Sequence, residues 1–208
     1  MLLAVALLIG ISNVVVAGQI SGSAHDFAVE DWTGGKICIA CHAPHHTDTS
    51  TIEAPLWNHA VTVAVFNLYA SATLDATISQ PGGSSKLCLS CHDGTVAINS
   101  FGGVTGAEFL SPPKSLTTNL ANDHPIGFTY DTALVTADGA LHPTSNPANI
   151  GSGGQVKTGT IESNLLFNGR MECSSCHDVH NTFTADTGDA LIKITQDGST
   201  LCLTCHNK

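Results

Sequence analysis

Apolar residues are distributed unevenly along the chain. Residues 1–17 form a nearly continuous apolar run, broken only by Gly10, Ser12 and Asn13. Residues 58–72 (NHAVTVAVFNLYASA) mix apolar and polar positions, and both a helix and a strand remain open for them. Glycine, serine, threonine, asparagine and aspartate are frequent in the middle of the chain, so we expect much of it to be coil.

Two other segments, residues 165–167 and 190–194, are rich in large apolar residues and are candidates for short strands. Short helical turns are expected around the cysteine motifs described below, where histidines three residues apart would then share a helix face. The pattern as a whole predicts mostly coil with short helices and few short strands.

The apolar run at the N-terminus resembles a secretory signal. Val15 and Ala17 suit cleavage before Gly18. The basic start of such signals is missing, because the first lysine or arginine is Lys36. A membrane anchor is the alternative, but the run is short for a membrane span. We therefore expect residues 1–17 to be a removed signal peptide, and the mature protein to be secreted, extracellular or on the outer cell surface, with no stable membrane span.

Composition and charge narrow the choice of partners. Only 12% of the 208 residues are charged and 5% are aromatic, so the chain alone would form a thin core. The formal net charge of −10 argues against nucleic acid, whose binding needs a basic surface. Acidity of this size also has the simpler role of keeping a protein soluble.

All eight cysteines belong to one motif, C-x-x-C-H, which occurs four times. This motif is the attachment signal for c-type haem, in which the two thiols bond to the porphyrin and the histidine binds the iron. The sequence therefore predicts four covalent haem c groups. The attaching cysteines are Cys38, Cys41, Cys88, Cys91, Cys173, Cys176, Cys202 and Cys205. The histidines that complete the motifs are His42, His92, His177 and His206.

A zinc ribbon and a redox dithiol are the alternative interpretations of paired cysteines. A zinc ribbon gives no reason for a histidine after every pair, and a thioredoxin-like motif would occur once beside a βαβ pattern. Covalent haem explains all four copies and leaves no cysteine unused. Four porphyrins would also supply apolar surface for the chain to wrap, and their ligation would contribute to folding.

Each iron needs a second axial ligand, commonly histidine or methionine. The only methionines are Met1 and Met171, whereas seven histidines lie outside the four motifs. The sequence therefore predicts histidine on both sides of the irons, which makes them six-coordinate and low-spin. The expected distal ligands are His25, His45, His59, His124 and His180. Two spare histidines, His46 and His142, are expected at the surface.

The motifs form a loose internal repeat. Each half of the chain contains a histidine, then CxxCHxxH, then LCLxCH, which suggests two haem pairs, each on one supersecondary unit. Turn signals at 101–103 and 111–113 separate the halves. We predict a first haem-pair half at residues 18–110 and a second at residues 111–208.

Several segments together resemble the multihaem cytochromes of metal-reducing bacteria. They are residues 21–27 (SGSAHDF), 38–46 (CIACHAPHH), 55–59 (PLWNH), 87–94 (LCLSCHDG) and 122–125 (NDHP). The chain is similar to the tetrahaem subunits of extracellular cytochrome filaments, the OmcE-type nanowires, over most of its mature length. This resemblance implies stacked bis-histidine haems, head-to-tail polymerisation with copies of itself, and electron transfer to other redox proteins or extracellular acceptors. It does not assign a distal histidine to each iron.

Two other functions remain open from the sequence. A monomeric periplasmic or cell-surface electron shuttle would share every motif, and a multihaem reductase would need one iron with an open position. We expect an electron-transfer protein, not an enzyme, because the spare histidines can fill all the axial positions. His25 lies in a segment rich in glycine and serine, so it could reach a neighbouring subunit or fold back onto its own chain.

Overall fold

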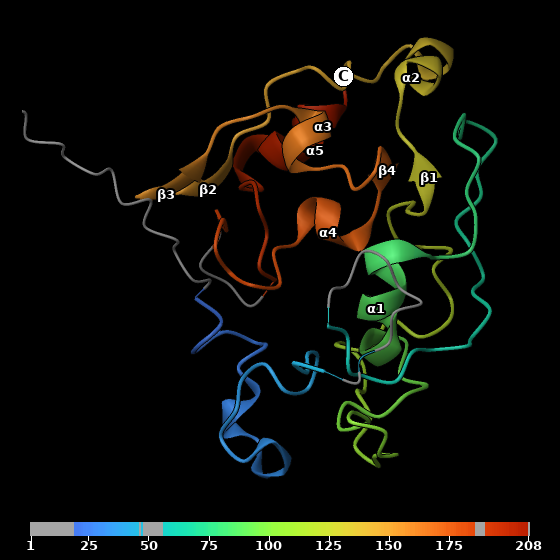
Figure 1. Ribbon diagram of the computed structural model, residues 1–208. Helices are drawn as coiled ribbons and strands as arrows, with labels where there is room; N and C mark the ends of the chain where they lie inside the picture. Colours follow the sequence, from blue (N-terminus) through green and yellow to red (C-terminus); the bar gives the residue numbers. More distant parts are fainter. Residues whose placement is uncertain (1–18, 46, 48–55, 186–189, 208) are drawn as a thin grey trace, which may run out of the picture.

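The computed structural model describes residues 19–45, 47, 56–185 and 190–207 (Figure 1). The expected signal at 1–17 and the spare His46 lie outside the described residues. The described chain is mostly coil, with a few short helices and two small antiparallel sheets, which confirms the predicted fold class. In this described part, none of the helices is long and apolar enough to span a bilayer.

The helices and strands are short, and most connect through irregular segments. The α-helices are α1 (Gly83–His92), α2 (Thr132–Asp138), α3 (Ile161–Asn164), α4 (Cys173–Cys176) and α5 (Thr200–Cys205). The 3-10 helices are η1 (Phe27–Val29), η2 (Asp31–Thr33) and η3 (Asp197–Ser199). The strands are β1 (Phe128–Thr129), β2 (Ile150–Ser152), β3 (Gln155–Lys157) and β4 (Arg170–Met171).

Local sequence signals explain where α2 begins and ends. The Asp131 carboxylate caps its N-terminus by accepting a hydrogen bond from the Leu134 N–H at 2.9 Å. Gly139 ends it with a left-handed φ of 69°, a conformation that costs glycine little. This helix therefore carries both of the standard boundary residues.

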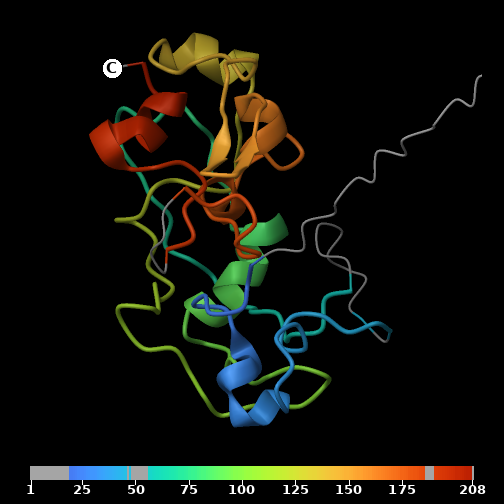
Figure 2. The same ribbon diagram turned by 90° about the vertical axis from the view of Figure 1, so that its left-hand side faces the viewer.

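The two predicted halves of the chain are not separate in space (Figures 1 and 2). η1 and η2 lie at one end, while α2, α3, α5 and the β2–β3 hairpin lie at the other. Ala76 and Ile78 of the first half nevertheless pack against the core of the second. Helices α1 and α4 contact each other between these two ends. The predicted division near residue 110 stays a prediction, but the contact between α1 and α4 joins the two predicted halves.

The main hydrophobic core belongs to the second half of the chain. It consists of Phe128, Tyr130, Leu134, Ala148, Ile150, Ile161, Leu165, Leu166, Met171 and Ile194. Two smaller clusters form around α1: Trp57 with Leu87, and Phe66 with Leu89 and Leu120. The described part of the first half therefore has only a small hydrophobic core, as expected from composition.

Residues 58–72 form neither the helix nor the strand that the sequence left open. The segment is extended, and side chains satisfy part of its backbone: Ser90 Oγ accepts from Thr62 N at 3.0 Å, and the Gln80 amide bonds both backbone groups of Phe66. Isolated bridges, His59 with Phe101 among them, complete the pairing. Side-chain partners thus replace a strand ladder.

The candidate strands at 165–167 and 190–194 do not form either. Phe167 and Ile192 take part in isolated bridges, to Arg170 and to His177 respectively, and neither bridge extends into a strand. The apolar residues of both segments contribute to the core instead, where Leu165, Leu166 and Ile194 are buried. Their hydrophobicity reflects core packing more than sheet pairing.

Candidate haem-attachment sites

Each CxxCH motif makes one turn that brings its residues together. The second, third and fourth copies lie on α1, α4 and α5, and the first lies on a turn closed by a hydrogen bond from His42 N to Cys38 O at 2.8 Å. The same bond from the histidine to the first cysteine recurs in the third and fourth copies, at 3.1 and 2.9 Å. Two thiols three residues apart therefore lie on one side of each turn, as attachment to one porphyrin requires.

The chain becomes extended at the histidine of two motifs. His177 follows α4 with φ −106° and ψ 138°, and His206 follows α5 with φ −100° and ψ 134°. The expectation that His177 and His180 share a helix face is therefore wrong. The helical turn ends at Cys176 because the next residue bridges to Ile192, which turns the chain out of the helix.

The second cysteine of every motif has a raised pKa, caused first by burial. Burial raises the pKa of Cys41 and Cys205 to about 11 and that of Cys91 to about 12, and it also raises the pKa of Cys176. These thiols stay protonated at neutral pH. Reactive thiols of redox CxxC motifs have a lowered pKa instead. Cys173, the first cysteine of the third motif, does have a lowered pKa, caused first by its interaction with Cys88, so these pKa shifts do not by themselves decide against a dithiol.

Three of the four motif histidines face another histidine across a gap of nearly constant width. The ring centroids are 6.2 Å apart for His42 and His180, 6.0 Å for His92 and His25, and 6.4 Å for His206 and His124. A metal–imidazole bond is about 2 Å long and the ring centre lies about 1 Å further, so two imidazoles on opposite sides of one metal ion have centres about 6 Å apart. The three gaps match this spacing.

Backbone carbonyls hold the other side of several of these rings. Nδ1 lies 2.9 Å from Lys114 O in His92, 2.6 Å from Ala190 O in His177, and 2.9 Å from the carbonyl of the following proline in His124. Metal-binding histidines commonly donate their second ring N–H in this way, which fixes the tautomer and leaves Nε2 for the metal. These rings are held as axial ligands require.

His25 is half-buried in a group of histidines. Burial lowers its pKa to about 4, and the neighbouring His92, His177 and His180 contribute to this lowering in that order. Its Nδ1 is buried without a hydrogen-bond partner. The ring is therefore neutral at physiological pH, the form that binds a metal. Its place beside His92 of the same chain does not support the expectation that His25 reaches a neighbouring subunit.

A second buried donor without a partner lies beside the first motif. The Trp57 indole Nε1 is buried and unsatisfied, and the ring stands edge-on to His42 at 6.2 Å and 88°. Buried polar groups are rarely left without a partner. The spacing of the histidine rings and the two buried nitrogens without a partner, His25 Nδ1 and Trp57 Nε1, are compatible with a haem group at these sites.

The other predicted distal ligands are placed differently. His59 is buried, but its Nδ1 and Nε2 face backbone oxygens at 2.7 and 3.1 Å, and Nε2 also lies 3.5 Å from Cys91 Sγ. His45 is exposed, and the spare His142 is half-buried with its backbone N–H bonded to Cys205 O. None of these three belongs to the three ring pairs above. Their roles stay predictions.

Met171, the only methionine outside the apolar run at the start, lies in the main core. It pairs with Phe128 across the two strands β1 and β4 and is 5% exposed. Packing against this cluster occupies its side chain. That histidine supplies the distal ligands stays a prediction.

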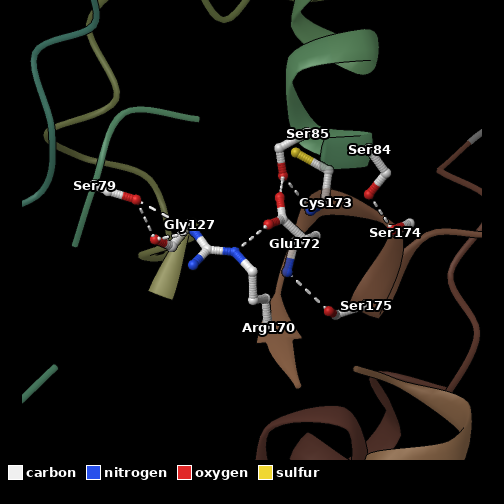
Figure 3. A network of polar contacts seen from close by, with 9 residues as sticks. All are labelled: Ser79, Ser84, Ser85, Gly127, Arg170, Glu172, Cys173, Ser174 and Ser175. Carbon is white, nitrogen blue, oxygen red and sulfur yellow. Dashed lines mark hydrogen bonds and ion pairs between the residues drawn. The ribbon is translucent and has the colours of Figure 1, made fainter. Parts of the chain in front are cut away.

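Sequence reasoning missed one polar cluster at the contact of α1 and α4. There, Glu172 is buried against Ser85 (Figure 3). The thiols of Cys88 and Cys173 lie near this contact, where their interaction raises the pKa of Cys88 and lowers that of Cys173. The only signal in the sequence is a pair of serines near the second motif and another inside the third. Such pairs are common in coil, so they could not have identified the contact.

One known family model matches part of the chain. It describes a doubled CXXCH motif and matches residues 167–208, which contain the third and fourth motifs. No curated protein matches the chain. The doubled motif implies covalent haem c, and together with the eight paired cysteines and the histidine gaps it indicates a multihaem c-type cytochrome that binds haem for electron transfer.

Proposed function

We propose that the protein is a tetrahaem electron-transfer cytochrome whose irons are bound by histidine on both sides. The observation that carries this proposal is the constant spacing of three motif histidines from a second histidine, between 6.0 and 6.4 Å. Bound haem iron supplies one-electron redox chemistry at each site. The cysteines of each motif tether the group, and the paired histidines hold it from both faces.

The protein side chains have a positioning role in this function. Two imidazoles at one iron leave no open position for a substrate, which favours electron transfer over a reductase activity. Carbonyl partners such as Lys114 O and Ala190 O fix ring orientation, and burial of His25 keeps its ring neutral. No acid–base residue is needed for the transfer itself.

His177 is the motif histidine outside the three ring pairs, and we propose His45 as its distal ligand. His45 holds the same place after the first motif that His180 holds after the third, and His180 already faces the first motif's His42. A reciprocal exchange between the two CxxCHxxH segments would fill the fourth position. A histidine donated by a neighbouring subunit is the alternative.

The test is the spin state of the iron bound by His177. In a His45→Ala variant, one iron of four is expected to become high-spin, whereas His142→Ala should change nothing. An all-low-spin spectrum for His45→Ala would exclude this assignment and leave the donation between subunits.

We further propose that subunits polymerise head to tail into an extracellular filament. The support is the resemblance of segments such as 38–46 and 87–94 to filament cytochromes, together with exposed apolar side chains on the extended segment 58–72. Val63 and Val65 there are 94% and 80% exposed, and contact with a neighbouring subunit would bury such residues. A head-to-tail contact propagates when its rotation does not close a ring.

Electron microscopy of the purified protein tests this part of the proposal. Filaments with a repeat of one subunit are the expected result. Single particles of one chain at all concentrations would instead show a monomeric electron shuttle, which keeps all the haem chemistry and loses the assembly. Three histidine pairs within one chain are compatible with that outcome.

A further inference from the structure

The second and third motifs meet where the two predicted halves join. Cys88 lies on α1 and Cys173 begins α4, and the two helices contact each other. Interaction between the two thiols raises the pKa of Cys88 and lowers that of Cys173. The points at which two different haem groups would attach therefore lie close together. Among the residues that the structure describes, contacts between helices of the two predicted halves are centred on this pair.

Hydroxyl groups fasten α1 to α4 around these thiols (Figure 3). Ser85 Oγ accepts a hydrogen bond from Cys173 N at 2.9 Å and donates one to the Glu172 carboxylate. Beside it, the hydroxyls of Ser84 and Ser174 bond each other. The N-terminal turn of one attachment helix is thus bonded directly to that of the other.

Glu172 is the charged centre of this cluster. Its side chain is 2% exposed and forms an ion pair with Arg170, from Nε to Oε1 at 3.2 Å. Arg170 also donates to Gly127 O at 2.6 Å and to Ser79 Oγ at 3.2 Å, so it ties the cluster to two further segments (Figure 3). The arginine side chain is 35% exposed, so water screens its charge far more than it screens the buried carboxylate.

We propose that Glu172 is a positioning residue for electron transfer between the haem groups of the second and third motifs. This inference rests on the proposed haem function. Glu172 holds the two attachment points in contact through Ser85 and stabilises the oxidised state of both sites with its negative charge. Electrons crossing from one half of the protein to the other would pass this junction.

The charge effect follows from the change at the iron. Oxidation removes one electron and adds one positive charge to the site, and reduction reverses this. A buried carboxylate stabilises the more positive state and lowers the reduction potential. A unit charge about 10 Å away at an effective dielectric constant of about 20 changes such an equilibrium about tenfold.

The first test replaces Glu172 with glutamine, which keeps the shape and removes the charge. In Glu172→Gln, two of the four haem reduction potentials should rise by about 59 mV each. This shift corresponds to a change of about tenfold in the equilibrium constant of a one-electron reduction. The matched control is Glu162→Gln, an exposed acid on α3 that should leave all four potentials unchanged. Potentiometric titration followed by absorbance measures both variants. Unchanged potentials in Glu172→Gln would overturn the charge effect.

The second test separates position from charge. Ser85→Ala removes the link between α1 and Glu172 but leaves the carboxylate in place. The paired signal that two coupled haem groups give in Soret circular dichroism should weaken, while the potentials move little. An unchanged signal would overturn the positioning role. If Glu172→Gln fails to fold, Ser85→Ala still decides this point.

The wild-type protein distinguishes failure of this inference from failure of the proposed function. A wild type that holds no covalent haem, or shows no reversible redox change, refutes the function itself. A fully loaded, redox-active wild type with insensitive variants refutes only the role of Glu172.

Discussion

The burial of His25 predicts a specific loss of stability in acid. Its pKa is lowered from 6.5 to about 4 in the folded protein, first by burial and then by neighbouring histidines. Between these two values the unfolded chain binds a proton that the folded chain does not, so the free energy of unfolding falls as the pH falls. The contribution is fully present above pH 6.5 and is lost on the way down to about pH 4.

The size of this effect follows from the two pKa values. A histidine whose pKa drops from 6.5 to about 4 contributes about 3 kcal/mol of pH-dependent stability. The side chain is half-buried, so solvent screening reduces this contribution. An iron bond at His25 would hold the neutral ring still more firmly and enlarge the effect.

Denaturant unfolding across the pH range from about 7 to about 4 measures this contribution. The difference between wild type and His25→Ala should shrink by up to about 3 kcal/mol over this range, because the variant lacks the titrating ring. His142→Ala, a histidine outside the three ring pairs, should follow the wild-type curve. In parallel, acid should convert the iron bound by His92 to high-spin. If the free energy of unfolding of wild type and of His25→Ala changes with pH in the same way, the reasoning is refuted.

Two further predictions concern the second half of the chain. Replacing His124 with alanine removes the ring opposite His206, so one iron should become high-spin in the absorbance spectrum while the other three stay low-spin; no spectral change would contradict the pairing. Replacing Ile161, which is fully buried in the main core, with alanine should cost about 2–5 kcal/mol in the free energy of unfolding by denaturant. The exposed Val63→Ala should cost less than about 0.5 kcal/mol, and equal losses for both would contradict the assigned core.

The sequence was most informative where chemistry is local. The spacing within C-x-x-C-H is set by one turn of chain, so the amino-acid sequence is enough to identify the attachment residues. Composition likewise predicted a coil-rich fold with little core, because glycine, asparagine and serine favour turns over ladders. The near absence of methionine led to the prediction that histidine is the distal ligand, and the structure places Met171 in the core.

Long-range pairing could not be obtained in the same way. His42 faces His180 across more than half of the chain, and no local pattern records that choice. His59 looked equivalent to the paired histidines in sequence, yet backbone oxygens of Ala60 and Ala97 lie against its ring nitrogens. Such assignments depend on how segments cross in space.

Two local expectations also failed for tertiary reasons. Residues 58–72 form neither a helix nor a strand, because side chains such as Ser90 and Gln80 satisfy part of their backbone hydrogen bonding. The shared helix face expected for His177 and His180 was lost because the bridge to Ile192 ends α4 at the preceding cysteine. In each case a partner distant in sequence decided the local conformation.

The central claim is that four haem groups are bound covalently, one at each C-x-x-C-H motif. Intact-mass spectrometry of the purified, denatured protein tests it most directly, because thioether bonds survive unfolding and axial bonds do not. The account predicts the mass of the mature chain plus four haem groups. A mass with fewer than four, or four pairs of free thiols that retain zinc under native conditions, would contradict it.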